Sequence, residues 1–209
     1  MMKNSFLLIL PFALIADIVI PFLLALPYKE YSHAFQVMSV LGNNKSPLHI
    51  VYNCWLILLG VVILINSFAI YDKLSQHSKI LATLLLIVMI IYAIGGCILS
   101  GIFQVGETKS LETISEKIHG YGSVIGFMLL TFAPLLCGLY LLKRNCTTYA
   151  IIALICFILA LVFFVLFVMS DKAEYKNTII ALEGMWQRLT LLFMYIPIAE
   201  ICLLSFQKL

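Results

Sequence analysis

Six long apolar stretches, separated by shorter polar and charged runs, make up most of this chain. A helix needs about 20 mostly apolar residues to cross the roughly 30 Å hydrocarbon layer of a membrane, and each stretch reaches about that length. The pattern therefore predicts an all-α fold, with one transmembrane domain of six helices over residues 1–209. The predicted spans are residues 5–26, 50–71, 80–103, 119–142, 148–170 and 185–206.

The connections between these spans alternate in length. Residues 27–49, 104–118 and 171–184 form long loops, whereas residues 72–79 and 143–147 form short ones. Consecutive spans cross the membrane in opposite directions, so the three long loops share one face, termed here the long-loop end. The two short loops and both termini share the other face, the short-loop end.

Lys and Arg are concentrated differently at the two ends, and cytoplasmic loops carry an excess of these residues. The short-loop end has six basic residues in little loop sequence, with Asp72 as its one acid. At the long-loop end seven basic residues are offset by seven acids. We therefore expect both termini and the short loops to be cytoplasmic. The six residues are Lys3, Lys73, Lys79, Lys143, Arg144 and Lys208.

Composition strengthens the membrane assignment and narrows the partners. The chain is 63% hydrophobic and 11% charged, with a mean hydropathy of +1.10, whereas a soluble domain is about half apolar and a quarter charged. Six spans leave no room for a separate soluble domain. The net charge of +3 is scattered and lacks the basic clusters that bind nucleic acid. Membrane lipids are the expected partners, and nucleic acid is not.

Two acids lie inside the predicted spans, where ionisable side chains are costly and usually functional. At ~1.5 Å rise per residue, Asp17, Tyr92 and Tyr195 share one depth, about 13 to 16 Å from the long-loop surface. Asp17 then either fixes helix packing or forms a substrate or proton site. Glu200 lies deeper, level with Asn66 across spans two and six, and its structural interpretation is the stronger one because cytoplasmic water is near.

Histidines gather at the long-loop end, where His33, His49 and His119 fall close to Asn53 and Glu116. Imidazoles beside carboxylates are typical of zinc or iron sites, and Glu-x-x-His is half of the di-iron pattern of helical bundles. The candidate metal ligands are His119, Glu116 and His49. The alternative is that the histidines are interfacial and that Glu116 stabilises the positive start of a helix.

Gln187 and Arg188 stand at the head of the last span. A guanidinium stays charged and binds phosphate or carboxylate through two parallel hydrogen bonds. Arg188 therefore either holds a lipid phosphate or anionic substrate, reaches the headgroups along its stem, or pairs with Glu183. The candidate ligand-binding residues are His119, Arg188, Gln187, His49, Asn53, His33, Asp17, Tyr92 and Tyr195.

Glycines concentrate in spans three and four, and in lipid they let helix backbones approach closely. We expect these two helices to form a packing centre. The glycines concerned are Gly95, Gly96, Gly101, Gly122, Gly126 and Gly138.

Short motifs near the span ends resemble the domain-of-unknown-function 998 (DUF998) family. The resemblance implies a prokaryotic membrane protein of about six spans, in the cytoplasmic (inner) membrane, and it carries no established activity to transfer. The positions that match lie at the long-loop end. The matching segments are Ser39-Val40-Leu41-Gly42 with Pro47, Gly101-Ile102-Phe103, His119-Gly120 and Gly184-Met185-Trp186-Gln187-Arg188.

Three functions remain open from the sequence. The first is a pocket at the long-loop end that binds a lipid headgroup or small anion. The second is a membrane enzyme acting on a lipid through a metal or a His119 and Glu116 acid–base pair, although no common catalytic motif or cofactor motif is present. The third is a small proton-coupled carrier using Asp17 and Glu200, for which six spans are few and a homo-oligomer is expected.

Overall fold

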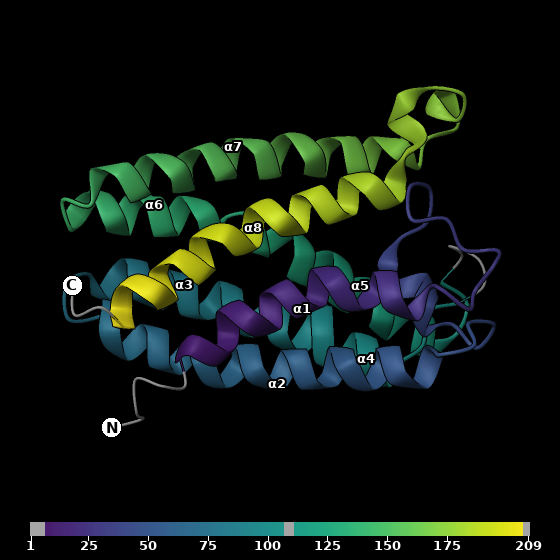
Figure 1. Cartoon of the computed structure of the whole chain (residues 1–209), viewed down its shortest axis with the longest axis horizontal. Coiled ribbons are helices and arrows are strands. Elements are labelled where there is room, and N and C mark those ends of the chain that lie inside the picture. Colours follow the sequence, from purple (N-terminus) through teal and green to yellow (C-terminus); the bar gives the residue numbers. More distant parts are fainter. Residues whose placement is uncertain (1–6, 107–110, 207–209) are drawn as a thin grey trace.

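The structure is a computed structural model that describes residues 7–106 and 111–206. Six helical segments run through one bundle (Figure 1). The third segment passes from α3 through the π-helix η3 into α4, and the fourth consists of α5 followed by α6. The segments are α1 (Ile9–Leu24), α2 (His49–Leu74), α3 (Lys79–Ile91) with η3 (Tyr92–Leu99) and α4 (Ser100–Ile102), α5 (Ile114–Leu130) with α6 (Ala133–Lys143), α7 (Thr147–Ser170) and α8 (Glu183–Phe206).

The six predicted spans are confirmed as helical segments. Five of them are long and apolar enough to cross a membrane, and α1 is a shorter apolar helix of 16 residues. The chain is thus a multi-pass membrane protein. The start of the predicted span 5–26 lies outside the described residues, as do Lys3, Glu107, Lys109 and Lys208, which enter the charge comparison.

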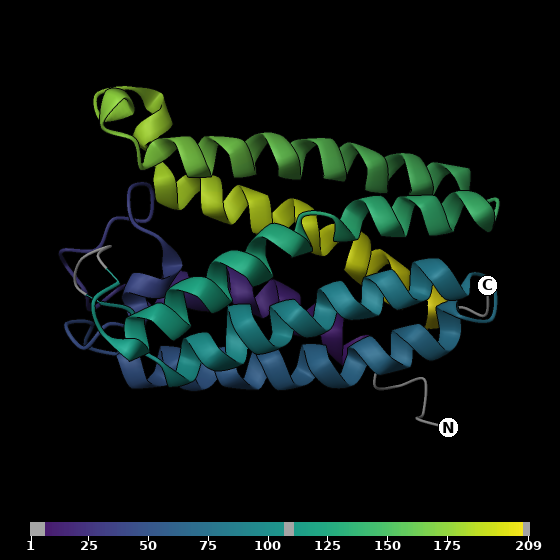
Figure 2. The ribbon, with the colours of Figure 1, turned by 180° about the vertical axis from the view of Figure 1, so that it is seen from behind.

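All three long loops lie at one end of the bundle, as the alternating loop lengths predict. Figures 1 and 2 show them beside the end of α1 and the start of α8, whereas α1 begins and α8 ends at the opposite side. The described loop residues form three short 3₁₀ turns, η2 (Met38–Gly42), η4 (Ala173–Tyr175) and η5 (Ile179–Ala181). In both views α7 runs along one edge of the bundle, next to α6 and α8.

The fourth segment differs from the single span expected over residues 119–142. It begins earlier, because Thr113 and Glu116 form a capping box that starts α5 at Ile114. It is also interrupted between Leu130 and Ala133. The cause is Pro134, which lacks an N–H and whose ring clashes with the carbonyl four residues earlier in a continuous helix.

The glycines of spans three and four make the close backbone contact that the sequence predicts. A Cβ atom at Gly95 would lie 2.6 Å from the carbonyl oxygen of Gly122, and one at Gly126 would lie 2.9 Å from the backbone nitrogen of Gly96. The contact lies within the π-helix η3, and such segments occur often at functional sites. This packing fixes the position of Tyr92, the first residue of η3.

Candidate functional site

A buried carboxyl group lies at the centre of the bundle. Asp17 of α1 is 2% exposed. Its Oδ1 accepts a hydrogen bond from Nε1 of Trp55 on α2 at 3.0 Å, and its Oδ2 accepts one from the Tyr195 hydroxyl of α8 at 2.9 Å. Both carboxylate oxygens are therefore satisfied, which offsets the cost of placing an acid inside the membrane.

Tyr92 extends this network by one more hydroxyl group. Its oxygen lies 2.5 Å from that of Tyr195. A phenol has a single proton, and Tyr195 gives its proton to Asp17, so Tyr92 is the donor to Tyr195. The resulting chain runs from Tyr92 through Tyr195 to Asp17. Connected hydroxyl and carboxyl groups of this kind can transfer protons along their hydrogen bonds.

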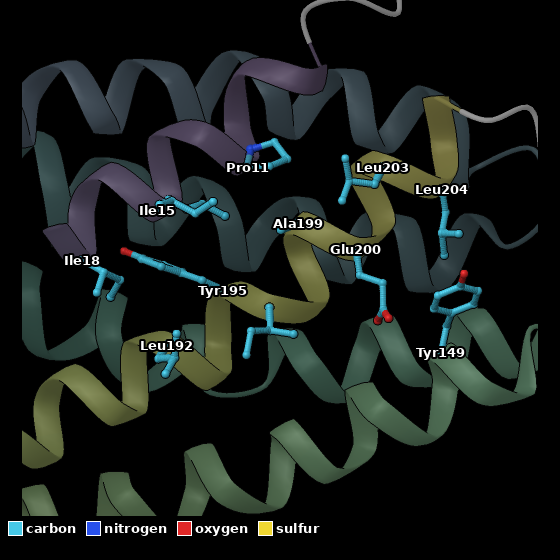
Figure 3. A pocket seen from close by; sticks show the side chains of 12 residues that line it. Pro11, Ile15, Ile18, Tyr149, Leu192, Tyr195, Ala199, Glu200, Leu203 and Leu204 are labelled. Atoms are coloured by element: carbon cyan, nitrogen blue, oxygen red, sulfur yellow. The ribbon is translucent and has the colours of Figure 1, made fainter.

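A groove opens on the outside of the bundle next to this network. It lies between α1, α7 and α8 and has a volume of about 460 Å³. Figure 3 shows Tyr195 reaching across from α8 toward α1. The same ring therefore forms part of the groove wall and holds the buried Asp17. The other walls are mainly aliphatic, with Leu14, Ile15 and Ile18 from α1 and Leu192, Ile196 and Leu203 from α8.

Glu200 gives the groove its acidic group. Its Oε2 is buried and has no hydrogen-bond partner within residues 7–106 and 111–206. Tyr149 of α7 also lines this part of the groove, and Figure 3 shows both residues toward one end, with Ile18 and Leu192 toward the other. The pairing with Asn66 that equal depth suggests is not formed in the described chain, where the Asn66 amide donates to the carbonyl of Val62 at 2.9 Å.

Arg188 of α8 lies at the long-loop end, and it is 8% exposed. Its Nη1 donates to the carbonyl oxygens of His33 and Gly184, both at 2.8 Å, and its Nη2 donates to the Tyr31 hydroxyl at 2.7 Å. The guanidinium carbon also lies 5.5 Å from the centre of the Phe22 ring, which adds a cation–π contact. Arg188 thus fastens the first loop to α8.

The charge of Arg188 also affects the two loop side chains that touch it. Burial lowers the pKa of His33, and the neighbouring guanidinium lowers it further. Burial raises the pKa of Tyr31, an effect that the charge and hydrogen bond of Arg188 only partly oppose. Both groups are therefore neutral near pH 7, and neither supplies an anion to Arg188.

The residues next to Arg188 at the start of α8 pack closely against the first long loop. A Cβ atom at Gly184 would lie 2.2 Å from the carbonyl oxygen of Gln36, so only glycine fits. The Met185 N–H donates to the carbonyl of Ala34 at 3.1 Å. Oε1 of Gln187 accepts the N–H of Met38 at 2.7 Å. The start of α8 therefore contacts the backbone of the first long loop, residues 27–49.

The histidines and Asn53 make similar contacts to backbone oxygens. Nδ1 of His119 lies 2.8 Å from the Phe103 carbonyl, and Nδ1 of His49 lies 2.8 Å from the Ser46 carbonyl. The Asn53 amide donates to the carbonyl of Gly42 at 3.1 Å. These side chains connect the helix ends to the loops beside them.

The three candidate metal ligands do not converge. Glu116 uses its carboxylate to accept the N–H of Thr113 at 2.8 Å, within the capping box of α5. In the described part of the chain, no three His, Cys, Asp or Glu side chains are grouped closely enough to hold a metal ion. The arrangement of His119, Glu116 and His49 therefore gives a metal-dependent enzyme no support, and Glu116 has the helix-start role that the sequence offers as the alternative.

A comparison with family models decides the relationship that the motifs suggest. The model described as "Protein of unknown function (DUF998)" matches residues 12–204, nearly the whole chain. The chain belongs to the DUF998 family. No curated protein and no solved structure matches it. The family has no assigned activity, so function has to be argued from the site itself.

In this DUF998 protein, the residues that carry the resemblance hold the long-loop end together. A Cβ atom at Gly42 would lie 2.3 Å from Oδ1 of Asn53, so this position too requires close approach. Sequence reasoning missed Trp55 and Tyr31, which supply hydrogen bonds to Asp17 and Arg188. The sequence signal that could have found them is a general one: when Trp and Tyr are buried, the indole N–H and the phenol hydroxyl usually form hydrogen bonds.

Proposed function

We propose that this protein binds a lipid-like molecule in the groove between α1, α7 and α8. The observation that carries the proposal is Glu200, whose buried Oε2 has no partner among the described residues. An unpartnered polar group in an apolar environment costs about 1–3 kcal/mol, and a ligand with a hydroxyl, amine or amide group would remove that cost. The ligand's polar group then lies at Glu200.

The remaining walls favour a ligand with an apolar body. Aliphatic side chains of α1 and α8 line the groove from Glu200 to Leu192, a distance of about 12 Å at 1.5 Å rise per residue. Tyr195 contributes its ring face, because its hydroxyl is already used by Asp17 and Tyr92. Glu200 and Tyr149 are the polar groups left for a ligand, and both stand toward one end.

The groove supports lipid binding better than the long-loop pocket that the sequence predicts. An anionic headgroup at the long-loop end would compete with the loop carbonyls and Tyr31 for Arg188. A ligand in the groove displaces no contact of the described chain. The hypothesis of a proton-coupled carrier that uses Asp17 and Glu200 stays a prediction, as does the homo-oligomer that it requires.

Photolabelling tests the groove. Purified protein is exposed to a photoreactive long-chain alcohol, and labelled peptides are identified by mass spectrometry. We expect labelling on α1 and α8, reduced about tenfold by Glu200→Leu, since leaving a buried polar group without its hydrogen bond costs about 1–3 kcal/mol. Leu192→Trp fills the groove and should reduce labelling as well.

Ile158→Trp provides the matched control for this experiment. Ile158 is 60% exposed on α7 and does not line the groove, so labelling of that variant should equal that of the wild type. Equal labelling of the wild type, Glu200→Leu and Leu192→Trp would overturn the proposal.

We further propose that the membrane is the prokaryotic inner membrane, with the short-loop end in the cytoplasm. The support is the six basic residues of that end against a single acid. In a variant without the six native cysteines, a cysteine at Asn145 should react with an impermeant maleimide only in lysed cells. One at Lys176 should react in intact cells. The reverse pattern would contradict this orientation.

A further inference from the structure

The short-loop end contains a second cavity, with a different chemical character. It has a volume of about 200 Å³ and lies between the ends of α2, α6 and α8. Its polar lining comes from Lys73, Gln76 and His77 near the end of α2, from Tyr140 and Arg144 around α6, and from Ser205 of α8. We propose that this cavity binds the phosphate group of an anionic ligand.

The charge of the cavity is the first argument. Lys73 and Arg144 are cationic, and no Asp or Glu is found among the described residues that line it. Charge-assisted hydrogen bonds from Lys and Arg are the usual means of binding phosphate. Basic cavities between transmembrane helices at one membrane surface bind phosphate headgroups. The ligand is therefore expected to be a phosphate monoester or diester, or free phosphate.

The contact between Arg144 and His77 is the second argument. Nη1 of Arg144 lies 3.1 Å from Nδ1 of His77. A guanidinium has only donors, so Nδ1 of His77 is the acceptor and the ring proton is on Nε2. The pair thus has no spare acceptor, and the free N–H groups of both side chains are available to an anion.

The backbone fixes where Arg144 stands. Asn145 follows α6 with a φ of 57°, and its N–H donates to the Leu142 carbonyl at 3.0 Å. The Cys146 N–H donates to the Leu141 carbonyl at 3.0 Å. These two bonds form a Schellman motif, a defined helix end. The backbone at Arg144 is therefore fixed before a ligand binds, which lowers the entropy cost of binding.

Basic residues at helix C-termini also stabilise the helix dipole without any ligand. That role alone predicts that Arg144 and Lys73 affect stability equally with and without phosphate. The cavity is also separate from the Glu200 groove, with Leu204 as the residue that lines both. Failure of phosphate binding would leave the groove proposal intact, and the reverse holds as well.

The experiment compares two sources of phosphate. In one arm, protein in nanodiscs of phosphatidylcholine with or without phosphatidylglycerol is released and analysed by native mass spectrometry for retained lipid. In the other arm, thermal unfolding in detergent is followed with and without inorganic phosphate, with chloride as the ionic-strength control. The variants are Arg144→Gln and Lys73→Gln. Lys79→Gln is the matched control, because Lys79 is exposed at the same end and does not line the cavity.

We expect each cavity variant to weaken binding about fivefold, and the double variant about twenty-fivefold, since each basic side chain near a membrane surface contributes about 1 kcal/mol. Selective loss of phosphatidylglycerol retention assigns the site to a lipid headgroup. Selective loss of stabilisation by inorganic phosphate assigns it to a soluble phosphate. Equal behaviour of Arg144→Gln, Lys73→Gln and Lys79→Gln in both arms would overturn the proposal.

Discussion

Arg188→Ala is expected to destabilise the protein by about 3–5 kcal/mol, because hydrogen bonds to a charged group contribute about 1.5–3 kcal/mol each and losses above about 5 kcal/mol are exceptional. The substitution removes the donors to the carbonyls of His33 and Gly184 and to the Tyr31 hydroxyl. It takes these donors away from partly buried oxygens, although Tyr31 keeps its own bonds to the Gln36 and Val37 carbonyls, and it releases the first loop from α8. The measurement is the free energy of unfolding in mixed micelles of detergent and sodium dodecyl sulfate.

Two further variants separate this effect from a simple loss of charge. Arg188→Lys keeps the charge but lacks the planar fork of donors, so an intermediate loss of stability is expected. Lys79→Ala removes an exposed charge and should change stability by less than about 0.5 kcal/mol. Limited proteolysis should cut residues 25–48 faster in Arg188→Ala only. The role assigned to Arg188 would be wrong if Arg188→Ala were as stable as Lys79→Ala.

Gly95→Val is expected to destabilise the bundle by about 3 kcal/mol or more, at the upper end of overpacking effects. The new Cβ would lie 2.6 Å from the Gly122 carbonyl oxygen, and the obstacle is backbone, which cannot move away as a side chain can. Spans three and four would have to separate, and Tyr92 would shift away from Tyr195. The measurement is thermal unfolding in detergent, together with the yield of folded protein.

Gly120→Ala is the control for this prediction. Its Cβ would lie 2.8 Å from a methyl carbon of Leu111, a flexible side chain that can adjust. Its expected cost is below about 1 kcal/mol. Similar losses in Gly95→Val and Gly120→Ala would show that backbone contact between η3 and α5 is not what limits this position.

The apolar pattern of the sequence locates most of the spans, because crossing a membrane requires a minimum apolar length. Apolar length alone locates α2, α3 to α4, α7 and α8 to within three residues of their observed ends. The fourth span departs from that rule at both its start and its middle. Its start depends on the hydrogen bonds between Thr113 and Glu116, and its interruption depends on Pro134, and apolar length reports neither.

The sequence predicts how deep in the membrane each residue of the buried network lies. It does not predict toward which neighbouring helix each side chain points. Rise per residue places Asp17, Tyr92 and Tyr195 at one level, and the structure joins them by hydrogen bonds. The same reasoning places Glu200 level with Asn66, yet Glu200 lines the outer groove. Equal depth is necessary for contact, but the rotation of each helix, set by packing against its neighbours, decides which residues meet.

The sequence by itself determined that this protein is a multi-pass membrane protein, where its apolar helical segments lie, and which rare polar residues need a partner. Only the tertiary structure decided which groups are their hydrogen-bond partners. Arg188 illustrates the reason, because it donates to the backbone carbonyls of His33 and Gln36, in a loop about 150 residues away. Every residue has a backbone carbonyl, so the sequence does not indicate which carbonyls accept a hydrogen bond from a side chain. Only the folded structure shows this.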